Sequence, residues 1–285
     1  MASEVKVDKL SQKGSSGIVI SDDIKLSSGK AIKNAAGTAL LGEDGALGSS
    51  LTMYGKSFRG SNYDRPGDGH YDIDVYTQVL IVSDHPDSSV NFQNSARKDK
   101  VVTITGAIHH DTTQAKIGQS SMYFDGADDY LAIPGTINNQ TTGPFTLDYW
   151  MWTADSGAGA VFDFRESGTT PYLYMDHVNT SEIQYFIGGS TGVKITPNGS
   201  GGVSDSEWHH IAICRDSSTW YFFWDGVAKT PTTGSLTADL TTDICGATDL
   251  RVGENFPSTG GYKDYIDEFR LSVGICRWTS NFTIY

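Results

Sequence analysis

Long hydrophobic runs are absent from this sequence of 285 residues, and cysteine is scarce. No window approaches the roughly 18 apolar residues that cross a bilayer, and MASEVKVDKL lacks the apolar segment of a secretory signal. The cysteines, Cys214, Cys245 and Cys276, are odd in number and lack the paired spacing of zinc ligands or of a disulfide scaffold. We therefore expect reduced, packed thiols, no membrane insertion, and synthesis in the cytoplasm.

Basic residues are also few. The chain has 21 Lys and Arg against 34 Asp and Glu, a net charge of −13. Residues 1–75 hold 9 basic and 10 acidic residues, so nearly all the excess acid lies in residues 76–285. A domain of this charge repels phosphate backbones, which excludes nucleic acid as an expected partner.

Amphipathic helical patterns are missing, and short strand patterns replace them. The 32 glycines, with many Ser, Thr, Asn and Asp residues, supply turns. Strand-like stretches rich in β-branched and aromatic residues are expected at 77–83, 100–106, 120–125, 130–134, 145–152, 160–166, 171–176, 182–188, 193–197, 207–216, 219–226, 249–254 and 265–274. This number of strands predicts an all-β, two-sheet jelly-roll sandwich over residues 76–285.

Residues 1–54 follow a different pattern of very short strands. Apolar residues recur in period-2 pairs between Gly-rich segments, too few for a core of their own. The residues expected to meet partner chains are Ile18, Ile20, Ile24, Leu26 and Ile32. We expect this extended region to oligomerise, with a trimer favoured, and to attach the protein to other proteins. Residues 55–75, rich in Gly, Pro, Asp and Asn, are the expected linker.

The N-terminal sequence resembles the shaft and attachment regions of tailed-phage fibre and appendage proteins. The resemblance rests on MASEVKVDKLS, SSGKAIKNAAGTALLG and GEDGALGS. It implies that several chains wind short strands around a shared axis and that the protein belongs to a virion assembled in a bacterial cytoplasm. A flexible Gly/Ser linker is the alternative interpretation of the same sequence.

Four stretches of the C-terminal part resemble the laminin-G-like, concanavalin-A-like jelly roll, in the order that the family shows. They are SMYFDGADDYLAIPG (121–135), PFTLDYWMW (144–152), EWHHIAICRDSSTWYFFWDGV (207–227) and YIDEFRLSVGICRWTSNF (265–282). The RWTSNF ending is similar to versions found in tailed-phage structural proteins. The resemblance therefore agrees with the one at the N-terminus.

Pleat geometry sorts the aromatic side chains of TWYFFWDG (219–226) into two rows. The jelly-roll resemblance, through the family's strand followed by an Asp-Gly turn, implies that Phe222 and Trp224 lie in the core, which leaves Tyr221 and Phe223 on an outer face. Asp225-Gly226 is a hairpin signal, because such turns need the positive φ that these residues tolerate.

Catalytic patterns are not found. Adjacent histidines on a strand, as at His209-His210, leave from opposite faces and cannot easily share a metal; we expect one packed and the other near the surface. There is no Gly-x-Ser-x-Gly elbow, and the seven glutamates never form a Glu-x-Asp-x-x-Glu run of the kind that glucanases use. We expect a protein that is not an enzyme and has no catalytic residues.

The jelly-roll resemblance implies two kinds of site. A structural Ca²⁺ would take carboxylates from Asp125, Asp128 or Asp129 and from Asp267, although solvated Asp residues explain the same sequence. Glycan binding would use exposed aromatic residues, for which Tyr221, Phe223, Tyr262 and Trp278 are the candidates. Contact with the core or another subunit is the competing interpretation of each.

These observations favour a virion structural protein, a tail fibre or appendage that displays the jelly roll toward host-surface glycans. A capsid decoration or cement protein of the same build is the first alternative. A glycan-active enzyme or a bacterial adhesin is the second.

Overall fold

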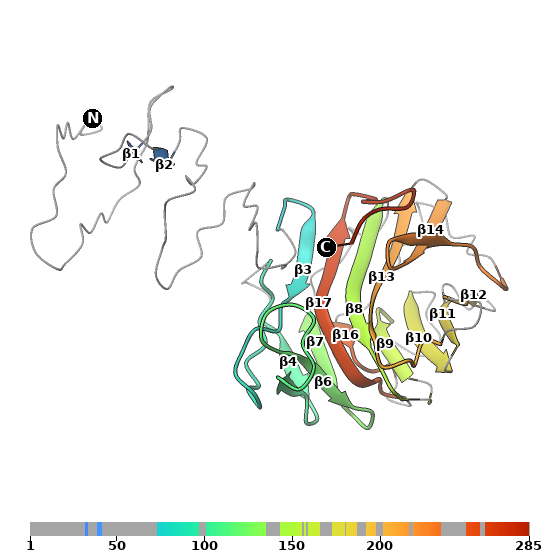
Figure 1. Ribbon diagram of the computed structural model, residues 1–285, viewed down its shortest axis with the longest axis horizontal. Helices are drawn as coiled ribbons and strands as arrows, with labels where there is room; N and C mark the ends of the chain where they lie inside the picture. Colours follow the sequence, from blue (N-terminus) through green and yellow to red (C-terminus); the bar gives the residue numbers. More distant parts are fainter. Residues whose placement is uncertain are drawn as a thin grey trace, which may run out of the picture. The chain divides into compact units, whose positions relative to one another are not determined.

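The computed structural model describes most of the chain from residue 73 onward (Figure 1). The described residues are 32–33, 39–41, 73–96, 101–134, 143–155, 157, 159–165, 173–179, 181–186, 192–197, 202–216, 219–234, 249–256 and 260–284. The chain divides into two compact units, Met1–Tyr63 and Asp64–Tyr285.

The first unit contributes one described element, an antiparallel pair of strands. β1 (Ile32–Lys33) pairs with β2 (Ala39–Leu41), and Ile32 lies opposite Leu41. The other residues expected to meet partner chains, Ile18, Ile20, Ile24 and Leu26, lie outside the described residues.

The second unit is a sandwich of two antiparallel sheets, which confirms the predicted all-β architecture. The seven-stranded sheet consists, in order, of β12 (Val193–Ile195), β11 (Glu182–Phe186), β10 (Tyr174–Asn179), β9 (Gly159–Asp163), β16 (Asp249–Val252), β7 (Tyr130–Pro134) and β4 (Thr103–Thr105). The described part of the chain contains no helix long and apolar enough to cross a membrane.

The eight-stranded sheet contains the longest strands. It consists, in order, of β15 (Val227–Lys229), β14 (Thr219–Trp224), β13 (Trp208–Asp216), β8 (Phe145–Trp152), β17 (Lys263–Val273), β6 (Ser121–Asp125) and β5 (His109–Asp111), and β3 (Thr77–Ile81) pairs with β17. All thirteen expected stretches contain a strand. β5 and β15 are not among them; their sequences, HHD and VAK, lack the alternation of apolar and polar residues that predicts a strand.

Side chains that alternate across the pleat fill the space between the two sheets. Phe222 and Trp224 are buried in the main hydrophobic cluster, as predicted, together with Ile211 and Ile213 on the neighbouring β13. Their side chains lie on one face because residues two apart on a strand point the same way. The intervening residues, Phe223 among them, therefore lie on the opposite face of this sheet.

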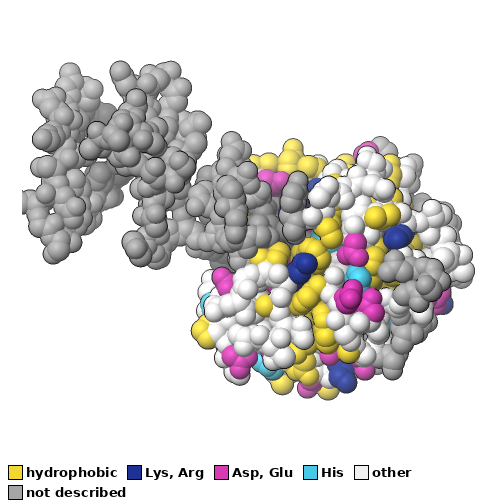
Figure 2. All heavy atoms as spheres, in the orientation of Figure 1, with side chains coloured by type: hydrophobic (Ala, Val, Ile, Leu, Met, Phe, Trp, Pro, Cys, Tyr) yellow, Lys and Arg dark blue, Asp and Glu magenta, His cyan; other side chains and the backbone are white. Residues whose placement is uncertain are grey.

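The last residues of the chain cover that opposite face. Residues 275–284, which we call the C-terminal strap, follow β17 and lie over β13 and β14. The rings of Trp278 and Phe282 stack on each other at 3.9 Å and contact the edge of the Phe223 ring. Hydrophobic side chains gather along the face where β8 and β17 lie (Figures 1 and 2). The strap thus encloses a second, smaller hydrophobic cluster outside the main core.

The Asp225-Gly226 turn holds the end of the strap. Both residues have positive φ, 50° and 71°, as the sequence signal predicts. The Phe282 amide donates to the Gly226 carbonyl at 2.9 Å, and a Cβ on Gly226 would lie 2.2 Å from the Phe282 carbonyl oxygen. Glycine is therefore required here both by the turn and by the close approach of the strap.

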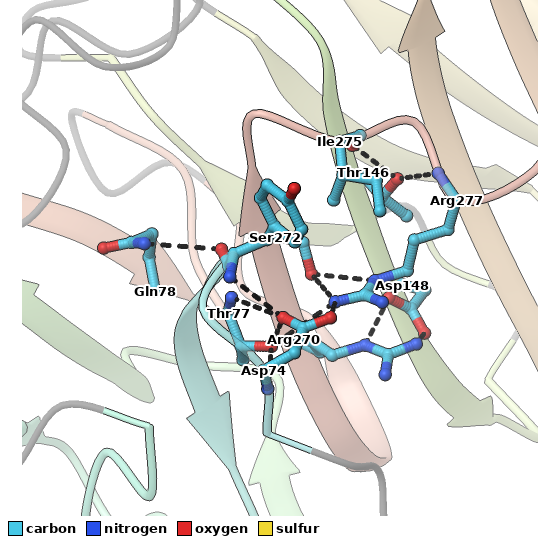
Figure 3. Close-up of polar contacts among 10 residues, drawn as sticks. Asp74, Thr77, Gln78, Thr146, Asp148, Arg270, Ser272, Ile275 and Arg277 are labelled. Atoms are coloured by element: carbon cyan, nitrogen blue, oxygen red, sulfur yellow. Dashed lines mark hydrogen bonds and ion pairs between the residues drawn. The ribbon is translucent and has the colours of Figure 1, made fainter. Parts of the chain in front are cut away.

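A buried ion pair lies under the strap, between the central strands β8 and β17. Arg270 donates to both carboxylate oxygens of Asp148, at 3.0 and 2.8 Å (Figure 3). His210 approaches the same carboxylate at 3.4 Å. Burial raises the pKa of Asp148, but the charge and hydrogen bonds of Arg270 and His210 outweigh burial and the net shift is downward. Asp148 is therefore an anion that depends on its partners.

Removal of Arg270 is expected to destabilise the fold strongly. Arg270→Met leaves the buried Asp148 carboxylate without its bidentate partner, which should lower the free energy of unfolding by about 3 kcal/mol or more. Lys194→Gln is the control, because it breaks a half-exposed pair with Glu182 and should cost less than about 1 kcal/mol. Urea unfolding measures both. Equal losses in the two variants would contradict the dependence of Asp148 on Arg270.

Candidate functional site

The outer face of the seven-stranded sheet carries half-exposed aromatic and charged side chains. Along β10, Met175 is buried while Tyr174 and Asp176 are partly exposed. On β11, Tyr185 is buried and Phe186 is partly exposed. The period of two thus sends one aromatic set into the core and a second set to the outside.

Strand register aligns the outward residues into a row across six strands. Tyr174 lies opposite Phe186 on one side and Asp163 on the other, and Arg251 lies between Asp163 and Ala132. In order across the sheet, the outer row consists of Phe186, Tyr174, Asp163, Arg251, Ala132 and Thr103. Directly opposed side chains on one face are close enough to interact. Within the row, Asp163 and Ala132 are buried, so the exposed residues lie on either side of them.

Three side chains at one end of the outer row form a stack. The Tyr174 and Phe186 rings are parallel, with centroids 4.4 Å apart, and the Arg165 guanidinium lies 3.5 Å from the Tyr174 centroid. Arg165 also forms a bidentate ion pair with Asp163, with N–O distances of 2.6–2.9 Å. Burial, then the charge of Asp176, raises the pKa of Tyr174 to about 12, so its phenol stays neutral. The stack is therefore rigid and carries hydrogen-bond donors at its rim.

A second cation–aromatic group lies toward the middle of the row. The Arg251 guanidinium is 4.4 Å from the Tyr130 ring centroid and 4.9 Å from that of Phe256. The Phe256 amide in turn donates to Asp163 at 2.7 Å. These contacts tie the loop after β16 to the outer row and place another ring and another guanidinium beside the stack.

Asp176 lies beside the stack with one oxygen unused. Its Oδ1 is buried and has no hydrogen-bond partner among the described residues. Burial raises the pKa of Asp176 to about 6; the charge of Arg165 opposes the shift and that of Asp163 adds to it. Buried polar atoms are rarely left unpaired, so Asp176 stands out as a carboxyl with unused acceptor capacity beside the stack. Gln184, opposite Asp176 on β11, adds an amide to the same patch.

The arrangement suits a ligand with both apolar faces and hydroxyl groups. The rings of Tyr174, Phe186 and Tyr130 offer apolar area, and the guanidinium of Arg165 and the carboxyl of Asp176 lie beside them. Charges on this face are balanced, because Asp163 pairs with Arg165 and Glu182 pairs with Lys194 at 3.1 Å.

The aromatic residues that the sequence nominated for ligand contact lie elsewhere, and two are inaccessible. Phe223 is 2% exposed beneath the strap, and Tyr262 is 0% exposed, donating from its hydroxyl to the Trp152 carbonyl at 2.8 Å. The expectation that these two are exposed is therefore wrong. Trp278 and Tyr221 are partly buried and pack against the small cluster around Phe223. Pleat geometry correctly put Phe223 outside the main core but could not show what covers it.

The histidines of β13 are both buried, contrary to the expectation that one lies near the surface. His210 lies under the strap, and His209 packs against Trp224 with centroids 4.5 Å apart. His209 is held between two carboxylates, with Asp225 at 2.7 Å from Nδ1 and Asp205 at 3.1 Å from Nε2. Burial lowers the pKa of His209, but the two carboxylates outweigh burial and the net shift is upward.

Two groups of side chains among the described residues are close enough to share a cation. In the first, Asp205, Glu207 and His209, the raised pKa favours the imidazolium, which has no lone pair for a metal. In the second, ligand oxygens of Asp125, Asp128 and Asp129 all lie within 4.8 Å of one another. Only the second group has the oxygen ligands that Ca²⁺ prefers.

Backbone amides already donate hydrogen bonds to two carboxylates of the Asp125–Asp129 loop. Asp129 accepts hydrogen bonds from the Asp125 and Ala107 amides, and Asp125 accepts one from Ala127. Asp128 is exposed. The loop is therefore organised by Asp129, while Asp125 and Asp128 retain carboxylate oxygens toward solvent.

Asp267, which the sequence placed among the Ca²⁺ ligands, lies in a different part of the domain. It lies on β17 four residues beyond Lys263, the partner of Asp125, a distance of roughly 13 Å along the strand. Its carboxylate is 0% exposed and accepts hydrogen bonds from the amides of Ile117 at 3.0 Å and Glu268 at 2.9 Å. The expectation that Asp267 joins the cation ligands is wrong, because a register shift in β17 turns it toward the loop before β6.

The matching family model is described as the Concanavalin A-like lectin/glucanases superfamily and covers residues 124–273, more than half of the chain. The chain belongs to this superfamily. No curated protein matches the sequence.

Solved structures share the fold at low identity. The botulinum neurotoxin serotype D binding domain is 8% identical, with a TM-score of 0.51, over 73% of this chain and 49% of that one. A botulinum neurotoxin type C structure, whose cell entry depends on two ganglioside molecules, is 8% identical with a TM-score of 0.50, over 69% and 47%. The binding domain of botulinum neurotoxin DC with rat synaptotagmin II is 9% identical with a TM-score of 0.50, over 69% and 48%. The chain spans about half the length of these structures.

We propose that Asp125, Asp128 and Asp129 hold Ca²⁺ and that the ion stabilises the fold. Millimolar Ca²⁺ is expected to raise Tm by about 3 °C over EDTA, since a weak site stabilises the native state by mass action. Asp128→Asn should remove the shift while leaving Tm in EDTA nearly unchanged. Differential scanning calorimetry measures both, with Mg²⁺ as the ion control. Identical Tm values of the unmodified protein in EDTA and Ca²⁺ would contradict the site.

Proposed function

We propose that the protein is a non-enzymatic virion appendage of a tailed phage whose jelly-roll domain binds glycans on the host surface through the outer row of the seven-stranded sheet. The observation that carries the glycan part is the Arg165–Tyr174–Phe186 stack beside the unpartnered oxygen of Asp176. Sugar rings present apolar C–H faces and a rim of hydroxyl groups, and this surface offers complements to both.

The balance of charge on the row favours a neutral glycan. Asp163 is neutralised by Arg165 and Lys194 by Glu182, so the surface offers no excess of one sign to a strongly charged ligand. Donors from Arg165 and Arg251 and the acceptor of Asp176 match hydroxyl groups, which both donate and accept.

One observation supports a binding role over a catalytic one. Both oxygens of Asp163 are engaged by Arg165, and one also by the Phe256 amide, so this carboxylate is not free to attack a sugar.

The virion part of the proposal rests on the sequence. The short strand pairs of residues 1–54 and the RWTSNF ending resemble tailed-phage structural proteins, and β1 pairs with β2 inside the first region. Attachment through this region to other virion proteins, as a trimer, would display several jelly rolls together. Weak contacts by each copy would then add up to strong adhesion.

Structural relatives are consistent with this role. Cell entry of botulinum neurotoxin type C depends on interaction with two ganglioside molecules, which carry sugars. At 8% identity the likeness shows the fold alone, so the glycan proposal depends on the side chains of this chain rather than on those of the neurotoxin.

Loss of the stack is expected to weaken glycan binding. The full-length protein is first screened on an array of bacterial surface polysaccharides and mammalian glycans, and the hits are measured by calorimetry. Tyr174→Ala should reduce affinity about tenfold or more, because it removes the ring between Arg165 and Phe186. Tyr221→Ala on the opposite sheet is the matched control and should leave affinity unchanged.

A second variant tests the acceptor. Asp176→Asn keeps the size of the side chain but removes the carboxylate, so binding should weaken and lose its dependence on pH around 6. The unmodified protein should bind better at pH 7.5 than at pH 5, where Asp176 is protonated. No hit on the array, or hits that depend on Tyr221 and not on Tyr174, would overturn the glycan proposal.

Removal of residues 1–60 tests assembly. Light scattering is expected to give about three chain masses for the full-length protein and one for the shortened chain, since apolar pairs such as Ile18 with Ile20 need partner strands. Circular dichroism of the shortened chain should retain the β spectrum as a control for folding. Equal monomeric masses for both would contradict the oligomerising role.

A further inference from the structure

Two of the three cysteines, 62 positions apart in sequence, meet where the strap crosses β13. Cys214 is directly opposite Thr146 in the pairing of β13 with β8. Thr146 donates from its hydroxyl to the Ile275 carbonyl at 3.1 Å and accepts a hydrogen bond from the Arg277 amide at 2.9 Å (Figure 3). Cys276, the residue between these two contacts, is therefore held over Cys214.

Packing and hydrogen bonding agree on the pairing of the two side chains. Cys276 packs against the small cluster formed by Ala212, Cys214 and Phe223. Cys214 is 0% exposed, whereas Cys276 is half-buried, so a reagent in solvent reaches Cys276 first. A hydrogen bond from Cys214 lowers the pKa of the Cys276 thiol, while burial, then the bond with Cys276, raises the pKa of Cys214. The outer cysteine has the character of an attacking thiol and the inner one of a resolving thiol.

We propose that Cys214 and Cys276 are a modification site, a thiol pair that low-molecular-weight disulfides such as glutathione disulfide convert into an intramolecular disulfide. The Cys276 thiolate attacks one sulfur of glutathione disulfide and releases one glutathione. The Cys214 thiolate then attacks the Cys276 sulfur of the mixed disulfide and releases the second. Two cysteines are oxidised, one glutathione disulfide is reduced, and the two thiol protons end on the released glutathiones.

The bond would add a covalent link to β13 at the start of the strap. Hydrogen bonds of Thr146 with Ile275 and Arg277 already hold Cys276 in place there, and Arg277 also donates to Asp74 at 2.9 Å. At the other end, the Ala228 amide donates to Asn281 and the Phe282 amide donates to the Gly226 carbonyl. A disulfide here joins strand and strap covalently and leaves the outer row on the other sheet untouched.

Oxidation of a Cys245→Ser variant tests the proposal, because only the two cysteines in question remain. Treatment of the full-length variant with glutathione disulfide should lower its intact mass by two hydrogens, and peptide mapping should join the segments containing Cys214 and Cys276. Tm should rise by about 5 °C or more, since the bond closes a loop of more than sixty residues. Dithiothreitol should reverse both changes.

The double variant Cys245→Ser, Cys276→Ser is the matched control and should show neither change. Two thiols still reactive toward maleimide after oxidation would overturn the proposal. So would a gain of one glutathione without the internal link, which would show that Cys214 cannot resolve the mixed disulfide. Both results come from the variant that retains the pair, so misfolding of the control cannot produce them.

Discussion

The Asp148–Arg270 ion pair is the contact on which the outer side of the eight-stranded sheet depends. Both residues point away from the main core, where a sheet face would ordinarily meet water, yet they are 0% and 6% exposed. Two charges taken out of water need a complete partner set and a dry surrounding. The strap supplies the dry surrounding through Trp278 and Phe282, and it needs in turn the flat apolar face that Phe223 offers. Charge pair and strap therefore stabilise each other.

The strap covers one part of the outer face of the eight-stranded sheet, over β13 and β14. The same face carries a second aromatic group, in which Tyr123 and Trp152 pack against Tyr265, and the seven-stranded sheet carries the Tyr174–Phe186 pair. On the seven-stranded sheet, Arg165 and Arg251 lie on the rings of Tyr174 and Tyr130, which are only half-buried. The same kinds of side chain, guanidinium, carboxylate and aromatic ring, thus stabilise the sheet that the strap covers and form the proposed binding surface on the other.

The sequence predicts the strands of this fold well because alternation is a local property, visible in ten residues. Alternation places Phe222 and Trp224 on one face, and the resemblance to the jelly roll identifies that face as the core. It does not predict the cover over Phe223, because the covering residues lie more than fifty positions later and no local pattern links them. The sequence does not predict that Tyr174 and Phe186 face outward. Their neighbour Tyr185 is also aromatic but is buried, so aromatic content alone does not distinguish the inner row from the outer one. The alternation of Tyr174 with the buried Met175 was the available signal.

Many of the aspartates that make the chain acidic have a structural role in the folded domain. Several aspartates serve as acceptors for backbone amides in loops: Asp129 receives two, Asp264 receives those of Ala154 and Asp155, and Asp267 receives three. Asp264 does so at a φ of 93°, a conformation that its own hydrogen bonds help to hold. Much of the negative charge is therefore used to build turns between short strands rather than to select a partner. Asp176 differs from these three because its buried Oδ1 has no hydrogen-bond partner among the described residues, and this difference is why we propose the binding surface at the outer row rather than at the acidic loops.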